Sequence, residues 1–364
     1  MHAAPARAAD PGITDTEIQI GQSITLLGGR SRYGLEVLAG MKALFDEVNR
    51  QGGVAGRRLS LRTLDDENDP ARAEANARKL VEQGAFLLFG AVEGGASTAV
   101  MAAANDLKVP FFGPLAGAPG LRRPHQPLVF VVRAEHRDEF RALIRHGKSV
   151  GLQRVALFHG DSAAGREHLA NVQQIALDSG LAFGGGLPFK ADISDVQLDA
   201  AAATLAQRQV DLVINQGSAP IYERLIRRAR AAGSRIAFWG VNSGSSPLAE
   251  ALGPLAEGMV FSQVVPNPWA RKTALVREYQ DRYRQALPAA TFSYGSLEGY
   301  ATAKTLVAAL ARAGKTPSRG GLLAALQNFD VDLGGLTVRY RKGEHTGSNF
   351  VDLALVARDG RFVQ

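Results

Sequence analysis

Cysteine is absent from the 364 residues of this chain, which excludes disulfide bonds, thiolate nucleophiles and zinc–thiolate sites. Aromatic residues make up only 7% of the chain, and no apolar run reaches the ~18 residues of a membrane-spanning helix. Lys and Arg outnumber Asp and Glu by 42 to 35, for a net charge of +7. No basic run interleaves with aromatic residues as a stacking platform for nucleic acid would require. We therefore expect no nucleic-acid partner.

Motifs of several enzyme classes are also missing. The sequence has no GxxxxGK[ST] phosphate loop and no GxGxxG after its first expected strand, which argues against a nucleotide cofactor. The seven histidines form no HExxH motif and no metal-ligand pair with a carboxylate. We expect no metal site and no cofactor. His136 and His146 are predicted to lie on a solvated helix.

One serine remains a candidate nucleophile. Residues 159–162 read HGDS after an expected strand, and they contain the GDS of one serine-esterase family. A serine esterase around Ser162 is therefore an alternative function. The closing glycine of a GxSxG elbow is replaced by Ala164, however, so Asp161 or Ser162 is more simply the N-cap of the next helix.

Glycine is abundant, at 40 residues, as many strand–helix turns would require. Short apolar runs at residues 17–26, 58–65, 85–89 and 110–113 alternate with amphipathic stretches at 33–50, 70–83 and 96–107. Asp69 followed by Pro70 is typical of a helix start. This alternation predicts a parallel sheet with helices on both faces.

The same pattern restarts after residues 121–127. Strands are expected at 154–158, 212–215 and 236–239, with helices at 137–150, 165–178 and 221–232. Further helices are expected at 270–286, 297–313 and 320–327, and antiparallel strands at 336–340 and 350–357. We predict an α/β chain with two doubly wound units, whose ligand sites lie beyond the carboxyl ends of the strands.

Two charged groups are expected to be structural. Asp65, Asp66 and Asp69 do not have the spacing of a calcium loop, and Asp69 already has a capping role. The arginines between residues 224 and 230 lie on one predicted helix and are expected to form a solvated face.

Several short motifs, in order, carry a family resemblance. They are NRQGGVAGR from Asn49, LDDENDP from Leu64, FG from Phe89, VPFFGP from Val109, RRARAAG from Arg227, EG from Glu257 and SLEGY from Ser296. Together they resemble type I periplasmic solute-binding proteins of ABC uptake systems, in the leucine/isoleucine/valine and amide-binding branch. The resemblance extends over about residues 13–360.

The resemblance implies two lobes, joined by three hinge crossings, that trap a ligand when they close. One lobe maps to residues 12–132 plus 266–334 and the other to 133–265 plus 335–364. The crossings fall near 132/133, 265/266 and 334/335. Residues 1–11 form either a signal-peptide remnant, with an A-x-A site at Ala6–Ala8, or a disordered start.

The same resemblance places the ligand site in loops at the strand ends of both lobes. The expected ligand-binding residues are Arg30, Tyr33, Glu93, Gly94, Gly95, Ala96, Ser97, Leu115, Ala116, Gly117, Ala164, Ser218, Ala219, Asn242 and Ser243.

These positions depart from the amino-acid binders of the family. The hydroxyl positions of the first loop fall on residues 94–96, and the usual Thr of the second falls on Gly117. The aromatics that close over the ligand align with Ala164 and with residues 218–219. The acid that pairs with an α-ammonium aligns with Asn242, and an amide cannot replace that charge–charge contact. A ligand bulkier than, or different from, a simple α-amino acid is implied.

The resemblance therefore implies a non-enzymatic, monomeric periplasmic protein, exported with its signal peptide removed. Its partners are a small organic ligand and a membrane ABC permease. A ligand-sensing subunit that signals to a membrane partner remains an alternative, because a permease and a sensor would recognise the same closed surface.

Overall fold

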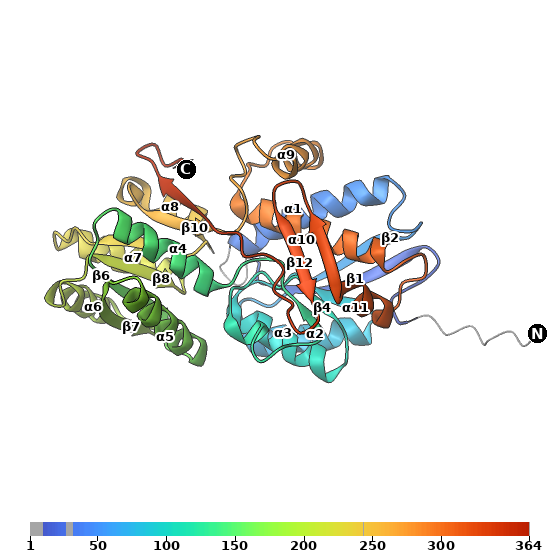
Figure 1. Ribbon diagram of the computed structural model, residues 1–364, viewed down its shortest axis with the longest axis horizontal. Coiled ribbons are helices and arrows are strands. Elements are labelled where there is room, and N and C mark those ends of the chain that lie inside the picture. The colour runs from blue at the N-terminus through green and yellow to red at the C-terminus, as the bar shows by residue number, and fades with distance from the viewer. Residues whose placement is uncertain (1–9, 27–31, 243, 364) are drawn as a thin grey trace, which may run out of the picture. The chain divides into compact units, whose positions relative to one another are not determined.

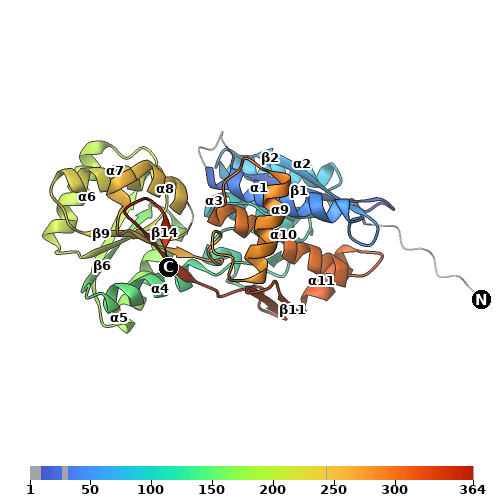
Figure 2. The same cartoon turned by 90° about the horizontal axis from the view of Figure 1, so that it is seen from above.

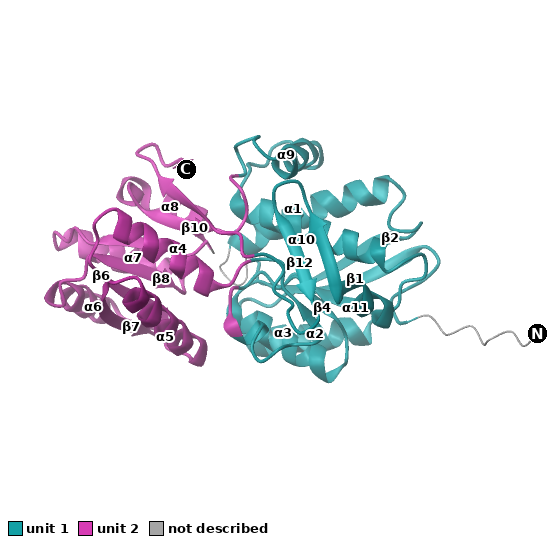
Figure 3. Ribbon diagram, in the orientation of Figure 1, with its two compact units in different colours: residues 1–116, 120–133, 268–348 teal, residues 117–119, 134–267, 349–364 magenta. Residues whose placement is uncertain are grey.

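The computed structural model describes residues 10–26, 32–242 and 244–363, which form two α/β units (Figure 3). Unit 1 comprises residues 1–116, 120–133 and 268–348, and unit 2 comprises residues 117–119, 134–267 and 349–364. Arg30, Ser243 and the segment 1–9, with its expected A-x-A site, lie outside the described residues.

Unit 1 is built on a five-stranded parallel sheet in the order β2-β1-β3-β4-β5. Its strands are β1 (Glu17–Ile24), β2 (Arg58–Asp65), β3 (Leu87–Phe89), β4 (Phe111–Phe112) and β5 (Val129–Phe130). Its helices are α1 (Arg32–Arg50), α2 (Pro70–Glu82), α3 (Gly94–Asp106), α9 (Ala274–Ala286), α10 (Tyr294–Arg312) and α11 (Arg319–Leu326) (Figure 1).

Local sequence explains how these helices start and pack. Asp69 caps α2 by accepting the Arg72 N–H at 2.9 Å, and Pro70 follows as its first residue. Helices α1 and α10 approach closely at two glycines. A Cβ on Gly40 would lie 1.8 Å from the Ser296 carbonyl oxygen, and one on Gly299 would lie 2.1 Å from that of Val37.

A separate hairpin changes the expected course of the chain. Strands β11 (Asn328–Asp332) and β12 (Thr337–Arg341) pair antiparallel in unit 1. Gly334 and Gly335, expected at a crossing, instead form the turn of this hairpin, where both have positive φ. Their N–H groups donate to Asp332. The chain enters unit 2 for the last time after Ser348.

Unit 2 contains a seven-stranded sheet in the order β14-β13-β10-β9-β8-β6-β7. Its strands are β6 (Arg154–Gly160), β7 (Ala182–Phe189), β8 (Leu212–Gln216), β9 (Ala237–Gly240), β10 (Val260–Gln263), β13 (Asp352–Val356) and β14 (Phe362–Val363). Strands β6 to β10 are parallel, and β13 and β14 add antiparallel, as predicted for 350–357.

Helices cover both faces of this sheet. They are α4 (His136–Ser149), α5 (Ala163–Asp178), α6 (Asp195–Gln207), α7 (Ala219–Ala231) and α8 (Ser245–Leu252). Figure 2 shows α6, α7 and α8 on one face and α4 and α5 on the other. Each face has its own apolar cluster, one around Tyr222 and Phe238 and one around Phe140 and Trp239. The predicted α/β class with two doubly wound units is confirmed.

Among the described residues, no helix combines the length and the apolar character that crossing a membrane requires.

Candidate functional site

The two units share one strand order. In unit 1 the order is β2-β1-β3-β4-β5, so the chain adds β2 on one side of β1 and the later strands on its other side. In unit 2 the order β7-β6-β8-β9-β10 has the same switch, between β6 and β8. Ligands of such sheets bind beyond the carboxyl ends of the strands at this switch point. The predicted site residues that are described begin α1 or follow β3 and β4 in unit 1, and follow β6, β8 and β9 in unit 2. Gly117, which also follows β4, belongs to unit 2.

Glu93, at the carboxyl end of β3 in unit 1, has strained backbone. Its φ of 64° and ψ of 141° lie in a region that residues with a side chain rarely adopt, and such strain is concentrated at functional sites. The side chain is half-buried. Burial raises the pKa of its carboxyl, and nearby Asp66 raises it further, whereas Arg133 lowers it. The Glu93 carboxyl, at this edge of the sheet, therefore loses its proton less readily than an ordinary glutamic acid.

A buried polar network lies beside Glu93 in the same unit. The Tyr33 hydroxyl donates to Oε2 of Glu298 at 2.5 Å, and Nη1 of Arg133 lies 3.6 Å from Oε1 of the same carboxylate. Burial, followed by the Glu298 charge, holds the pKa of Tyr33 well above its usual value. Tyr33 was predicted as a site residue from the sequence, but Arg133 and Glu298 were not.

The glycine-rich loop after β3 begins helix α3. Gly94 and Gly95 lie in its first turn, and Ala96 is fully buried. Ser97, predicted as a polar ligand contact, is also fully buried and donates to the Ala91 carbonyl at 3.3 Å. The Ser97 hydroxyl is therefore used in a hydrogen bond within the loop.

The loop after β4 is likewise fixed by local contacts. Leu115 is buried and donates to the Ala91 carbonyl at 2.7 Å, and the Ala116 carbonyl accepts from Arg122 at 3.2 Å. Gly117 carries no open space beside it. A Cβ there would lie 2.5 Å from Cγ and Nδ1 of His136. The absence of a side chain at Gly117 therefore leaves room for the His136 ring.

His136 contradicts the expectation of a solvated helix position, because it is only 6% exposed. Its Nδ1 lies 2.8 Å from Oε1 of Glu139. The other oxygen, Oε2, accepts from the Ser262 hydroxyl at 2.6 Å and from the Asn242 N–H at 3.1 Å. Glu139 thereby joins α4 to β10 and to the loop after β9, where the predicted residue Asn242 lies.

A second histidine packs against this group. The ring of His168 on α5 meets that of His136 edge-on at 5.2 Å. Burial, followed by the neighbouring His136, lowers the pKa of His168 to about 3, whereas Glu139 acts in the opposite direction. The His168 ring is therefore neutral at physiological pH.

The remaining predicted residues of unit 2 lie at helix starts. Ala164 is in the first turn of α5, and Ser162 caps that helix by accepting the Gly165 N–H at 3.0 Å, as its capping interpretation predicted. Ser218 caps α7 by accepting the Ile221 N–H at 3.4 Å, and Ala219 is the first residue of α7.

Sequence reasoning missed two amide side chains at the same edge of unit 2. Asn215 near the end of β8 and Gln263 at the end of β10 are 6% and 0% exposed. The available signal was an amide side chain near the end of a strand that begins with apolar residues.

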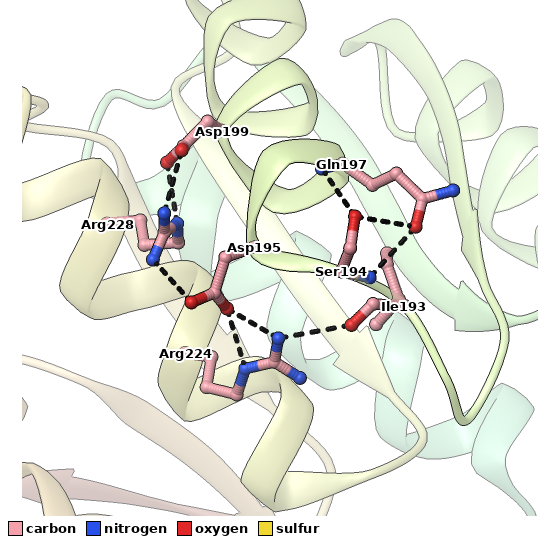
Figure 4. Close-up of polar contacts among 7 residues, drawn as sticks. All are labelled: Ile193, Ser194, Asp195, Gln197, Asp199, Arg224 and Arg228. Carbon is pink, nitrogen blue, oxygen red and sulfur yellow. Dashed lines mark hydrogen bonds and ion pairs between the residues drawn. The ribbon is translucent and has the colours of Figure 1, made fainter.

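The charged groups expected to be structural are structural. Asp66 accepts from the Thr25 and Ser23 hydroxyls at 2.6 and 3.1 Å. On α7, Arg224 and Arg228 pair with Asp195 and Asp199 of α6 (Figure 4). Across residues 10–26, 32–242 and 244–363, no three His, Asp or Glu side chains group in a way that could hold a metal ion.

Comparison with protein families gives one match over most of the chain. The model of a family described as periplasmic binding protein matches residues 17–361. Among curated proteins, the Leu/Ile/Val-binding protein of Escherichia coli (strain K12) is 26% identical over 253 residues, 68% of this chain and 67% of that protein.

Solved structures give matches over nearly the full length. A possible leucine/isoleucine/valine-binding protein from Rhodopirellula baltica SH 1 has a TM-score of 0.86 at 28% identity, and the match covers 98% of each chain. An ABC transporter solute-binding protein of R. palustris in complex with benzoate has a TM-score of 0.81 at 20% identity, covering 95% of each chain. The latter likeness supports the fold alone.

Proposed function

The chain belongs to the periplasmic binding protein family, and from this premise we propose that it captures a small organic ligand. We further propose that it works in the periplasm and delivers the ligand to a membrane ABC permease. The observation that supports this proposal is that the residues expected from the sequence to bind the ligand, where the structure describes them, follow the carboxyl ends of strands or begin helices in two sheets with the same strand order. Such edges are the ligand sites of doubly wound folds.

We also propose that the ligand differs from a simple α-amino acid or is bulkier. Asn242 occupies the position where the family resemblance implies an acid for the α-ammonium. A neutral amide leaves a buried ammonium without its counter-charge, which is unfavourable. Ala164 and Ala219 offer no aromatic ring to close over the ligand. One relative is named for Leu, Ile and Val, and another protein of this fold was solved in complex with benzoate, which supports a changed specificity.

The family consists of binding proteins rather than enzymes. The geometry of Ser162 agrees, because its hydroxyl oxygen accepts a backbone N–H at the start of α5. A role as helix cap accounts for this serine.

Native mass spectrometry of the chain purified from a periplasmic fraction tests the proposal. We expect a mass excess that corresponds to one small organic molecule per chain and disappears after unfolding and refolding. The released compound, once identified, should raise the midpoint of thermal unfolding when it is added back. A purified chain without bound compound, whose unfolding midpoint no member of a panel of amino acids, carboxylates and amides raises, would contradict the proposal.

A further inference from the structure

Two amide side chains lie on the same face at the carboxyl edge of the unit 2 sheet. Val213 on β8 and Phe261 on β10 belong to the apolar cluster on the face covered by α6, α7 and α8. Side chains two residues apart on a strand point to the same face. Asn215 and Gln263 therefore point to that face as well.

The two amides are staggered along the edge of the sheet. Gly240 at the end of β9 is in register with both Asn215 and Phe261, so Gln263 lies two residues nearer the carboxyl end of its strand than the level of Asn215. Strand β9 places no side chain between the amides at Gly240, and the Phe261 ring packs there instead, 3.2 Å from the position of a Cβ on Gly240.

Each amide is only partly hydrogen-bonded. Nδ2 of Asn215 lies 3.5 Å from the Gly217 carbonyl oxygen, and Nε2 of Gln263 lies 3.3 Å from the Ser245 hydroxyl. Within the part of the chain that the structure describes, Oδ1 of Asn215 and Oε1 of Gln263 have no hydrogen-bond partner. Buried polar atoms of this kind are rare, because their lost hydration is not replaced.

The contact with Gly217 determines which atom of Asn215 is left over. A carbonyl can only accept, so the NH₂ group must face Gly217 and Oδ1 must point elsewhere. The Ser245 hydroxyl can donate or accept, so Gln263 can present either its carbonyl or its NH₂ group. Asn215 is thus a fixed acceptor and Gln263 an adaptable group.

Two other amides, the partly buried Asn49 and the buried Gln22, have both side-chain polar atoms hydrogen-bonded. Asn49 uses both amide atoms on the Leu59 backbone, at 2.7 and 2.9 Å. Gln22 accepts from the Thr63 hydroxyl at 3.0 Å and donates to the Gly90 carbonyl at 3.3 Å. These two residues show what a structural amide looks like in this protein, and they serve as matched controls.

We propose that Asn215 and Gln263 contact the ligand, and that the ligand presents an N–H or O–H group to Oδ1 of Asn215. This inference rests on the proposed solute-binding function and names its ligand class: a small molecule with a hydroxyl or amide donor. A ligand whose only polar group is a carboxylate has only acceptors to place against Oδ1. Such a ligand does not fit this edge.

The first test measures stability without any ligand. The wild type and each variant are freed of bound compounds by unfolding and refolding, and their thermal unfolding midpoints are compared. Asn215→Leu removes an unsatisfied acceptor, so we expect an unchanged or higher midpoint. Asn49→Leu removes satisfied hydrogen bonds and should lower the midpoint by about 2–4 °C or more. Equal falls in both variants would overturn the proposal. Should Asn215→Leu not fold, Gln263→Leu is compared with Gln22→Leu by the same criterion.

The second test uses benzamide and benzoate, which have the same shape and differ in donors. We expect benzamide, and not benzoate, to raise the unfolding midpoint of the wild type, and Asn215→Leu to lose that response. Benzoate binding that Asn215→Leu leaves intact would overturn the proposal. If neither compound binds, the stability comparison decides.

The two proposals fail differently. If the solute-binding function fails, the wild type binds no small molecule at all. If only this inference fails, the wild type binds its compound, Asn215→Leu binds it equally well, and that variant is destabilised as strongly as Asn49→Leu.

Discussion

Gly117 lies so close to the His136 ring that no side chain fits at this position. An added Cβ would lie 2.5 Å from two ring atoms of His136, whose own position is fixed by Glu139. We expect Gly117→Ala to lower the free energy of unfolding by about 1–3 kcal/mol, the usual effect of overpacking a buried position. Urea denaturation measures this change.

Gly320→Ala is the matched control for this substitution. A Cβ on Gly320 would meet no atom within 4 Å, and the residue lies in the first turn of α11, where Ala favours the helix over Gly. Its unfolding free energy should stay the same or rise slightly. An equal loss in both variants would mean that His136 does not limit the space at Gly117.

His168 makes the free energy of unfolding depend on pH in the acidic range. Its pKa is about 3 in the folded chain against 6.5 as its ordinary value, so below pH 6.5 the unfolded chain binds a proton that the folded chain does not. Stability therefore falls as pH drops from 6.5 toward 3. Between pH 7 and pH 4.5 this residue should account for a loss of about 2–3 kcal/mol.

His168→Gln removes the titrating ring while keeping a polar side chain. We expect its unfolding free energy, measured in urea at pH 7 and pH 4.5, to fall by about 2–3 kcal/mol less than that of the wild type. Identical losses in the two proteins would show that other groups set the acid sensitivity.

Helix α4 is tied to its sheet by one carboxylate. Glu139 accepts the Ser262 hydroxyl of β10 at 2.6 Å in a fully buried position. Ser262→Ala should lower the unfolding free energy by about 1.5–3 kcal/mol, because a hydrogen bond to a buried charge is lost without replacement. Ser149→Ala, whose exposed hydroxyl donates to the His146 carbonyl at 2.8 Å, should change stability little. Equal effects in the two serine variants would argue against Glu139 as the tie.

Most of the element order was predictable, because most strands and helices have a local hydrophobic periodicity, but β5, β11, α6 and α8 were not predicted. Asp69 and Ser162 were found as caps because capping depends on residues within one turn. Strand β7 was missed, since its sequence AFGGGLPF has three glycines and lacks the β-branched content of a strand. The hairpin at Gly334 and Gly335 was misread as a crossing, because paired glycines suit a turn and a hinge equally well.

Of the candidate site, only its place at the carboxyl edges of the sheets could be predicted from the sequence. The strand ends identified the loops that carry Glu93, Ser218 and Asn242, since parallel strands end at one side of a sheet. Hydrogen-bond partners far apart in the sequence could not be predicted. Glu139 and Ser262, for example, are separated by 123 residues, and no local pattern links them. His136 was assigned to solvent for the same reason, as its helix gives no sign of the glycine it packs against.

At the scale of the whole molecule, opposite charges are largely paired on the surface. Many charged side chains form surface pairs, such as Arg228 with Asp199 on neighbouring helices, and these pairs add nothing to the net charge of +7. Exposed pairs of this kind typically contribute about 0.2–1 kcal/mol each. We propose that ligand selection depends instead on a few groups at the sheet edges, where Asn242 is neutral.

The neutral Asn242 leads to a test of the intact protein. Leucine, isoleucine and valine each carry an ammonium that would lose its hydration beside an amide, so we expect none of them at micromolar concentration to raise the thermal unfolding midpoint. A compound present at 100 times its Kd stabilises a protein by about 2.7 kcal/mol, which a thermal scan detects easily. The compound released from the purified chain serves as the positive control. A clear rise with any of the three amino acids would show that this chain holds an α-ammonium without the acid at that position.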